Sequence, residues 1–258
     1  MELHVHQWGE ASAPPLLCLH GVSSHGRRFR RLAEQRLAGR HRVIAPDLRG
    51  HGLSEWDPPW DLETHVGDIS ETLDDLEVEV AALVGHSFGG RLAIELAAAH
   101  PDRVSQMVLL DPAVWVPPPV AHERAEGLRV DESFATPAEA IEVRIAEGGS
   151  VLTPRRFLEE ELPEHLSRGD DGRYRYRYSR TAVIAAYGEM AKTPPLHKVR
   201  APALVVRGAD SEVMPEALVD VCRDQLPDCT VVTVPGGHIV MWDAFEETAE
   251  AITAFLDR

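Results

Sequence analysis

The sequence predicts an α/β fold built on a mostly parallel, doubly wound sheet. Between residues 16 and 111, short and continuously apolar runs alternate with longer amphipathic segments; the runs are LLCLHG, VIAPDL, AALVGHS and MVLLD. Such runs indicate strands buried on both faces, and parallel neighbours need a crossover helix that brings the chain back. The same alternation returns in APALVVRG and TVVTVPGGH, so we expect the chain to re-enter the sheet near its end.

Composition narrows the class of protein. Hydrophobic residues make up 44% of the 258 residues, enough for a large core, and no segment approaches the roughly 18 apolar residues of a membrane helix. Lys plus Arg is 26 against 42 for Asp plus Glu, and a net charge of −16 disfavours nucleic acid and anionic lipid as partners. We expect a soluble, cytoplasmic protein without membrane insertion; its oligomeric state is not predicted. The three cysteines suggest neither a disulfide framework nor a zinc site.

The opening segment, residues 3–8, is predicted to be a strand near an edge of the sheet, antiparallel to its neighbour. His4 and His6 alternate along it and could face a metal ion together. No third ligand is evident from the sequence, so we interpret both as exposed polar positions and expect no metal.

After Asp111 the chain becomes proline-rich and then charged, which predicts an insertion. Helices are expected near residues 138–147 and 154–166, and RGDDGRYRYRYSR is expected to form a solvated hairpin or a helix on the main body. The α/β core would then comprise residues 1–111 and 199–258, with residues 112–198 as a lid. Further helices are expected over residues 215–226 and 244–256.

The segment Gly85 to Gly89 has the pattern G-x-S-x-G between an apolar strand and a helix-forming stretch. A tight strand-to-helix turn needs small flanking residues, and it would present the hydroxyl of Ser87 as a nucleophile. Phe88 would open the helix with an unpaired N–H that can stabilise an oxyanion. The alternative is a glycine-rich turn whose serine only caps the helix.

Three further motifs accompany this turn: His20-Gly21-Val22, the segment DLRGHGLS at 47–54, and Gly236-Gly237-His238. With them the chain resembles the α/β-hydrolase fold superfamily, as a serine esterase-like or lipase-like member. The resemblance implies a helical lid inserted after strand 6, a second oxyanion donor at the N–H of Val22, and a chiefly structural role for the 47–54 turn.

A serine hydroxyl needs an imidazole to accept its proton, and the resemblance places that base at His238, in the loop before the last helix. His86 adjoins Ser87, but adjacent side chains at a sharp turn diverge, so we assign it packing or hydrogen bonding. His20 is expected to orient the oxyanion loop.

The acid that partners the base departs from the family's usual pattern, because the usual aspartate position is occupied here by Ser211. Some members place the acid one strand earlier, where this chain has Asp111. We predict Asp111 as the partner of His238, with Asp210 and Glu212 as alternatives.

These residues predict acyl transfer without a cofactor. A small or medium carboxylic ester is the expected substrate, cleaved through an acyl-enzyme on Ser87. Lactones, C–C bonds beside a carbonyl and perhydrolysis are alternatives within the same machinery. A small-molecule sensor that keeps the fold and the triad is a non-enzymatic alternative.

Trp115 and Trp242 are predicted to contact substrate, although packing between lid and body would also explain them. The same region supplies further candidate lining residues: Ser23, Ser24, His25, Phe88, Tyr187 and Ile239. The arginines at positions 27, 28, 30 and 31 could hold a substrate carboxylate, but a solvated helix face is the simpler interpretation.

Overall fold

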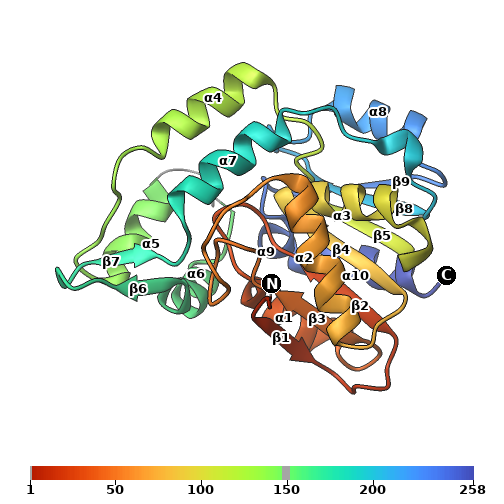
Figure 1. The fold of residues 1–258 in the computed structure, drawn as a ribbon, viewed down its shortest axis with the longest axis horizontal. Coiled ribbons are helices and arrows are strands. Elements are labelled where there is room, and N and C mark those ends of the chain that lie inside the picture. The colour runs from red at the N-terminus through yellow and green to blue at the C-terminus, as the bar shows by residue number, and fades with distance from the viewer. Residues whose placement is uncertain (1, 147–151) are drawn as a thin grey trace.

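The structure, a computed structural model, describes residues 2–146 and 152–258. One sheet has the strand order β1-β3-β2-β4-β5-β8-β9 (Figure 1); β1 is antiparallel to β3, and the other neighbouring pairs are parallel. The mostly parallel doubly wound sheet is therefore confirmed, as is the antiparallel strand at its edge. The strands are β1 (Val5–Trp8), β2 (Pro15–Leu19), β3 (Arg42–Pro46), β4 (Ala81–His86), β5 (Val104–Leu110), β8 (Ala203–Gly208) and β9 (Thr230–Val234).

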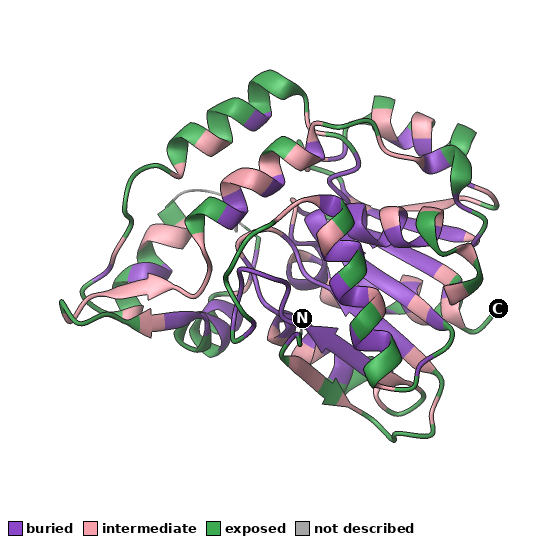
Figure 2. Cartoon of the chain, viewed as in Figure 1, coloured by how far each residue is buried: buried purple, intermediate pink, exposed green. Residues whose placement is uncertain are grey.

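Successive residues of the central strands enter cores on opposite faces of the sheet, as the period of two requires. Leu17 and Leu19 pack in one core, whereas Leu16 and Cys18 pack in the other, and the sheet is buried between its helices in Figure 2. The first core is covered by α2 (Leu62–Asp75), α3 (Phe88–Ala99) and α8 (Glu216–Gln225). The second is covered by η1 (Gly26–Phe29), α1 (Arg30–Leu32), η2 (Ala33–Leu37), α9 (Val240–Asp243) and α10 (Phe245–Leu256).

Glycines allow α3 to lie directly against the strands that flank it. A Cβ on Gly89 would lie 2.0 Å from the carbonyl oxygen of Leu19, and one on Gly85 would lie 2.4 Å from that of Gly89. No side chain fits at such distances. The small residues of G-x-S-x-G are therefore required by packing between β2, β4 and the helix.

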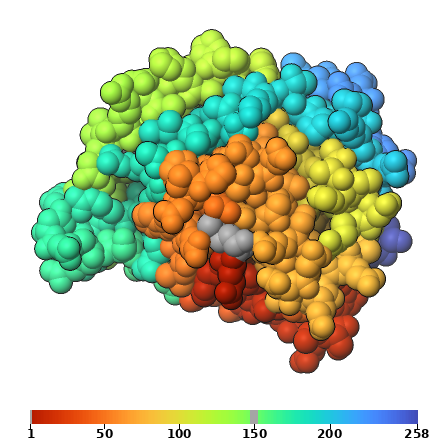
Figure 3. All heavy atoms as spheres, viewed as in Figure 1, coloured from red at the N-terminus to blue at the C-terminus, as the bar shows by residue number. Residues whose placement is uncertain are grey.

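The inserted segment leaves the sheet after β5, the fifth strand along the chain. The expected position after strand 6 is off by one, because the described chain forms a single strand ahead of β2. The segment makes a separate lobe beside the sheet, drawn in green and teal in Figures 1 and 3. Its elements are α4 (Pro118–Gly127), α5 (Pro137–Ala146), α6 (Arg155–Glu161), η4 (Leu162–His165), β6 (Leu166–Arg168), β7 (Tyr174–Tyr176) and α7 (Arg180–Met190).

The two predicted helices of the insertion correspond to α5 and to α6 with η4. The predicted end of the first, Glu147, lies outside the described residues. The arginine–tyrosine stretch contributes β7, which pairs with β6 as an antiparallel hairpin, so the hairpin interpretation is confirmed over its helical alternative. Short turns, η3 (Pro101–Arg103) and η5 (Leu196–Lys198), precede β5 and β8.

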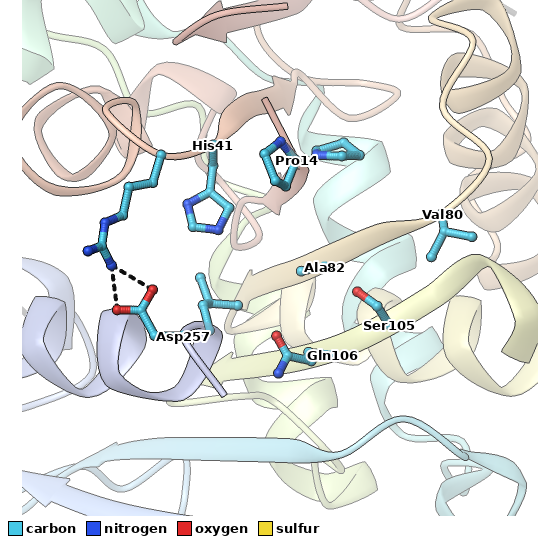
Figure 4. A pocket seen from close by; sticks show the side chains of 10 residues that line it. Pro14, His41, Val80, Ala82, Ser105, Gln106 and Asp257 are labelled. Carbon is cyan, nitrogen blue, oxygen red and sulfur yellow. Dashed lines mark hydrogen bonds and ion pairs between the residues drawn. The ribbon is translucent and has the colours of Figure 1, made fainter. Parts of the chain in front are cut away.

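A hollow of about 700 Å³ lies at the amino ends of β2, β4 and β5, where Pro15, Ala82 and Ser105 line it (Figure 4). Ser87 follows the carboxyl end of β4, so this hollow is at the opposite end of the sheet. Open α/β sheets bind ligands beyond the carboxyl ends of their strands, and we assign the hollow no part in the chemistry. Within the described ranges, no helix has the length and hydropathy needed to cross a bilayer.

Candidate active site

Ser87 occupies a turn that few non-glycine residues adopt. Its φ is 54° and its ψ is −117°, between the end of β4 and the start of α3. The turn is held from both sides: the N–H of Ser87 donates to Leu110 at 3.1 Å, and its carbonyl accepts from Ala113 at 3.0 Å. Such a backbone persists only where its surroundings impose it, and it is common at catalytic nucleophiles.

The segment after β2 packs against this turn. A Cβ placed on Gly21 would lie 3.1 Å from the Cβ of Ser87. His20 orients the segment, because its Nε2 accepts from the N–H of Leu48 at 2.9 Å while its Nδ1 donates to the carbonyl of Gly21 at 2.8 Å. Burial lowers the pKa of His20, which keeps this ring neutral. The expected orienting role of His20 therefore has a geometric basis.

Val22 and Phe88 are the predicted oxyanion donors. In the described part of the chain, neither N–H donates to a backbone or side-chain acceptor. Phe88 begins α3, so its N–H belongs to the first turn and has no partner within the helix. Their role as oxyanion donors stays a prediction.

His238 and Asp111 are brought together across the sheet. Nδ1 of His238 lies 2.7 Å from Oδ2 of Asp111. A carboxylate only accepts, so Nδ1 carries the proton and Nε2 is left as an acceptor. The side chain of His238 keeps 30% of its area exposed, whereas Asp111 is fully buried.

Asp111 is held by donors from the end of β8 and the loop after it. The N–H of Gly208 donates to Oδ1 at 3.0 Å, and the hydroxyl of Ser211 donates to Oδ2. Asp210 and Glu212 are exposed on either side of Ser211. The geometry thus favours Asp111 over these two alternatives. Ser211 stands where the resemblance expects an acid, and its contribution is a hydrogen bond to the acid.

His86 forms a hydrogen bond with the backbone of His238. Its Nε2 lies 3.0 Å from the carbonyl oxygen of His238, and the two rings are 4.8 Å apart at their centroids. Burial, followed by the charge of His238, lowers the pKa of His86 well below its usual value, so the ring is neutral and donates through Nε2. The hydrogen-bonding role expected for His86 is the one that the structure has.

The loop that carries His238 is also held by a side chain that the sequence analysis did not identify, Asp243. Oδ2 of Asp243 accepts the N–H of Gly237 at 2.9 Å, and Oδ1 accepts the hydroxyl of Thr153 at 2.6 Å. Asp243 therefore links the loop of His238 to the inserted segment. No motif in the sequence pointed to it.

The 47–54 turn is structural, as expected. Asp47 accepts the N–H of Gly26 at 2.7 Å and of Leu53 at 2.9 Å, and Arg49 forms a two-pronged ion pair with Asp68 of α2 at 2.6 and 2.7 Å. The turn therefore ties the segment after the oxyanion loop to α2.

His4 and His6 acquire the third polar neighbour that the sequence did not reveal. Ligand atoms of His4, His6 and Asp47 all lie within 4.8 Å of one another. Asp47 is already committed to two backbone donors and lies 3.3 Å from Nε2 of His6, contacts that a structural carboxylate explains.

The arginine cluster joins the inserted segment to the body. Instead of forming a solvated face, all four arginines meet glutamates from α6 and η4. Arg27 and Arg30 pair with Glu164, Arg28 with Glu161, and Arg31 with Glu160. The complementary glutamates at positions 159, 160, 161 and 164 were the available signal for this contact between the insertion and the body.

Trp242 and Trp115 are placed by packing contacts. The guanidinium carbon of Arg28 lies 4.3 Å from the ring centroid of Trp242, and the ring of Phe157 meets it edge-on at 6.4 Å. Trp115 lies 36% exposed and donates to the carbonyl of Ala191 at 3.1 Å. The contact with Phe157 favours packing between insertion and body for Trp242, whereas the hydrogen bond of Trp115 lies within the inserted segment; a contact with substrate stays a prediction for both.

A family model described as the alpha/beta hydrolase family matches residues 16–251. The chain belongs to the alpha/beta hydrolase family. This hydrolase is 32% identical to lipase LipV of Mycobacterium tuberculosis over 99% of its own length and 98% of that protein. It is 26% identical to esterase YbfF of Escherichia coli, covering 94% of this chain and 93% of that one.

Another relative of this alpha/beta hydrolase is 2-(acetamidomethylene)succinate hydrolase of Mesorhizobium japonicum, 30% identical over 96% of this chain and 90% of that protein. A crystal structure of E-2-(acetamidomethylene)succinate hydrolase superposes with a TM-score of 0.88 at 29% identity. The superposition covers 99% of this chain and 95% of the other. The family, the fold and a hydrolytic activity are therefore shared with these proteins.

Proposed function

We propose that this chain is a serine hydrolase that cleaves a small or medium carboxylic ester through an acyl-enzyme on Ser87. The observation that carries the proposal is the 2.7 Å contact between His238 and a fully buried Asp111 beside the strained turn of Ser87. The names of the lipase and esterase relatives support ester cleavage.

In the proposed cycle, Oγ of Ser87 attacks the ester carbonyl and passes its proton to Nε2 of His238. The N–H groups of Val22 and Phe88 stabilise the oxyanion, and Asp111 stabilises the imidazolium. His238 returns the proton to the departing alcohol as the C–O bond breaks. Water then attacks the acyl group and gives a proton to His238, which passes it to Ser87 as the acid leaves. No cofactor takes part.

The first test is labelling with a fluorophosphonate followed by mass spectrometry, together with turnover of 4-nitrophenyl esters of rising chain length. We expect the label on Ser87, and Ser87→Ala is expected to lose labelling and to lower kcat by about 10⁴-fold or more. Repeated turnover would distinguish an enzyme from a ligand sensor. Unchanged ester cleavage in Ser87→Ala would contradict the proposal.

The acid is tested by comparing Asp111→Asn, Asp210→Asn and Glu212→Gln on one ester. We expect a large loss of kcat for Asp111→Asn alone, because it would no longer hold the proton of His238 on Nδ1. The other two carboxylates are exposed and serve as matched controls. Full activity in Asp111→Asn would reject Asp111 as the acid.

A further inference from the structure

The loop that carries His238, residues 235–239 between β9 and α9, is packed closely on two sides, and we call it the base loop. On one side, a Cβ on Gly208 would lie 2.0 Å from the carbonyl oxygen of Gly237. On the other, Oδ2 of Asp243 accepts the N–H of Gly237 at 2.9 Å. Gly236 has φ 101°, and a Cβ there would lie 2.5 Å from the Cβ of Asp243. The backbone beside the proposed base is therefore held between the end of β8 and Asp243.

The carboxylate of Asp243 divides its two oxygens between the base loop and the insertion. While Oδ2 accepts the N–H of Gly237, Oδ1 accepts the hydroxyl of Thr153 at 2.6 Å. Thr153 is only 8% exposed, so this contact is shielded from water. The last torsion of an aspartate side chain is broad, and a single hydrogen bond does not fix the plane of its carboxylate. The hydroxyl of Thr153 supplies the second constraint.

The insertion meets the short helix after the base loop at two adjacent residues. Phe157 of α6 contacts the ring of Trp242 edge-on at 6.4 Å between centroids, and Thr153, just before α6, contacts Asp243. These two contact residues are the last of α9, which is four residues long. A helix of one turn has little stability of its own, and its position is set by tertiary packing. Docking of the insertion therefore helps to set where Asp243 stands.

We propose that Thr153 and Asp243 are positioning residues for His238. The hydroxyl of Thr153, carried by the insertion, orients the carboxylate that fixes the base loop, and the imidazole is aligned with its acid and its nucleophile only while this contact is made. The inference rests on the proposed esterase function and deepens it. Neither positioning residue touches the reacting atoms in the proposed cycle, so the whole effect passes through the base. A misplacement of about 1 Å at a reacting group lowers a rate by about 100-fold.

The first test removes the hydroxyl of the insertion and keeps the shape of its side chain. In Thr153→Val, we expect kcat on 4-nitrophenyl butyrate to fall about 10- to 100-fold while KM changes less than about twofold, because the base is displaced and the ester site is intact. Thr153→Ser keeps the hydroxyl and is expected to keep kcat within about threefold of the parent value. An unchanged kcat in Thr153→Val would overturn the proposal.

Thr72 of α2 provides a matched control on the opposite face of the sheet from α9. It is 5% exposed, and its hydroxyl donates to the carbonyl of Asp68 at 2.7 Å. Thr72→Val therefore removes one buried hydroxyl in the same way, and it is expected to leave kcat unchanged. Thermal denaturation of both variants records their stability. An equal fall in kcat in the two variants would reduce the effect to a general loss of stability and overturn the proposal.

A spectroscopic measurement follows the base without turnover. The proton on Nδ1 of His238, shared with Asp111 over 2.7 Å, is expected to give a proton magnetic resonance signal downfield of the backbone amides, and His238→Gln identifies the signal by its loss. We expect Thr153→Val to shift or broaden this signal, and Thr153→Ser and Thr72→Val to preserve it. A lower kcat in Thr153→Val with an unchanged signal would overturn the proposal, because the effect would not pass through the base.

The same signal separates this inference from the proposed function. If Ser87→Ala keeps full esterase activity but the signal of His238 still responds to Thr153→Val, the catalytic proposal fails and the positioning contact stands. If Ser87→Ala is inactive while Thr153→Val changes neither kcat nor the signal, the positioning proposal fails alone.

Discussion

Two residues at the ends of neighbouring strands share a positive φ, which residues with a side chain rarely adopt. Ser87 has φ 54° after β4, and Asp111 has φ 41° after β5. A non-glycine residue held in this region costs on the order of 1–3 kcal/mol. In both cases the conformation lies at the proposed nucleophile or its acid, so we interpret the strain as the cost of presenting these groups toward the base loop.

The strain at Ser87 predicts a difference in stability between two variants that both lack the hydroxyl. Ser87→Gly is expected to be about 1 kcal/mol more stable than Ser87→Ala, because glycine adopts positive φ without a Cβ clash. Both variants lose the hydroxyl and the proposed activity. Urea denaturation of the pair measures the difference, and equal midpoints with equal slopes would show that the turn stores no such strain.

At the scale of elements, close backbone approach decides where α3 sits. The helix lies against β2 through Gly89, and Gly89 follows the nucleophile by two residues. The contact positions the first turn of α3, including the N–H of Phe88. Stability and the proposed oxyanion hole therefore depend on the same packing.

A pair of alanine substitutions tests this packing. Gly89→Ala is expected to destabilise the protein by several kcal/mol or prevent folding, because its Cβ would meet the backbone of Leu19. Gly67→Ala, in the middle of α2 with nothing within 4 Å of an added Cβ, is expected to stabilise it by about 1 kcal/mol. Thermal denaturation measures both. A harmless Gly89→Ala would mean that α3 is not held by this approach.

At the scale of the whole molecule, the buried histidines link stability to pH. Burial lowers the pKa of His51 to about 4 and that of His65 to about 3, against 6.5 in an unfolded chain. The unfolded state therefore binds more protons below pH 6.5. Their contribution to stability is fully present above that pH and is lost as the pH falls toward the folded-state values.

The resulting prediction concerns the slope of stability against pH. At pH 5 each of these two histidines is expected to lower the free energy of unfolding by about 2 kcal/mol relative to pH 7.5, since one pKa unit corresponds to about 1.4 kcal/mol. His65→Phe should flatten the fall in the free energy of unfolding between pH 6.5 and 5. His122→Gln, an exposed substitution on α4, should leave the slope as it is. An unaltered slope in His65→Phe would contradict a neutral buried ring.

The sequence by itself determined the alternation of strands and helices, the edge position of the first strand and the glycine-flanked turn at Ser87, because each is encoded by neighbouring residues and a local period. It also indicated His238 and Asp111 as partners through a family resemblance. Only the tertiary structure decided that Asp111 rather than Asp210 or Glu212 faces His238, that Ser211 donates to that acid, and that Arg28 meets Glu161. These contacts join residues roughly a hundred or more positions apart, and their geometry arises from the packing of strands, loops and the insertion, which no local pattern specifies.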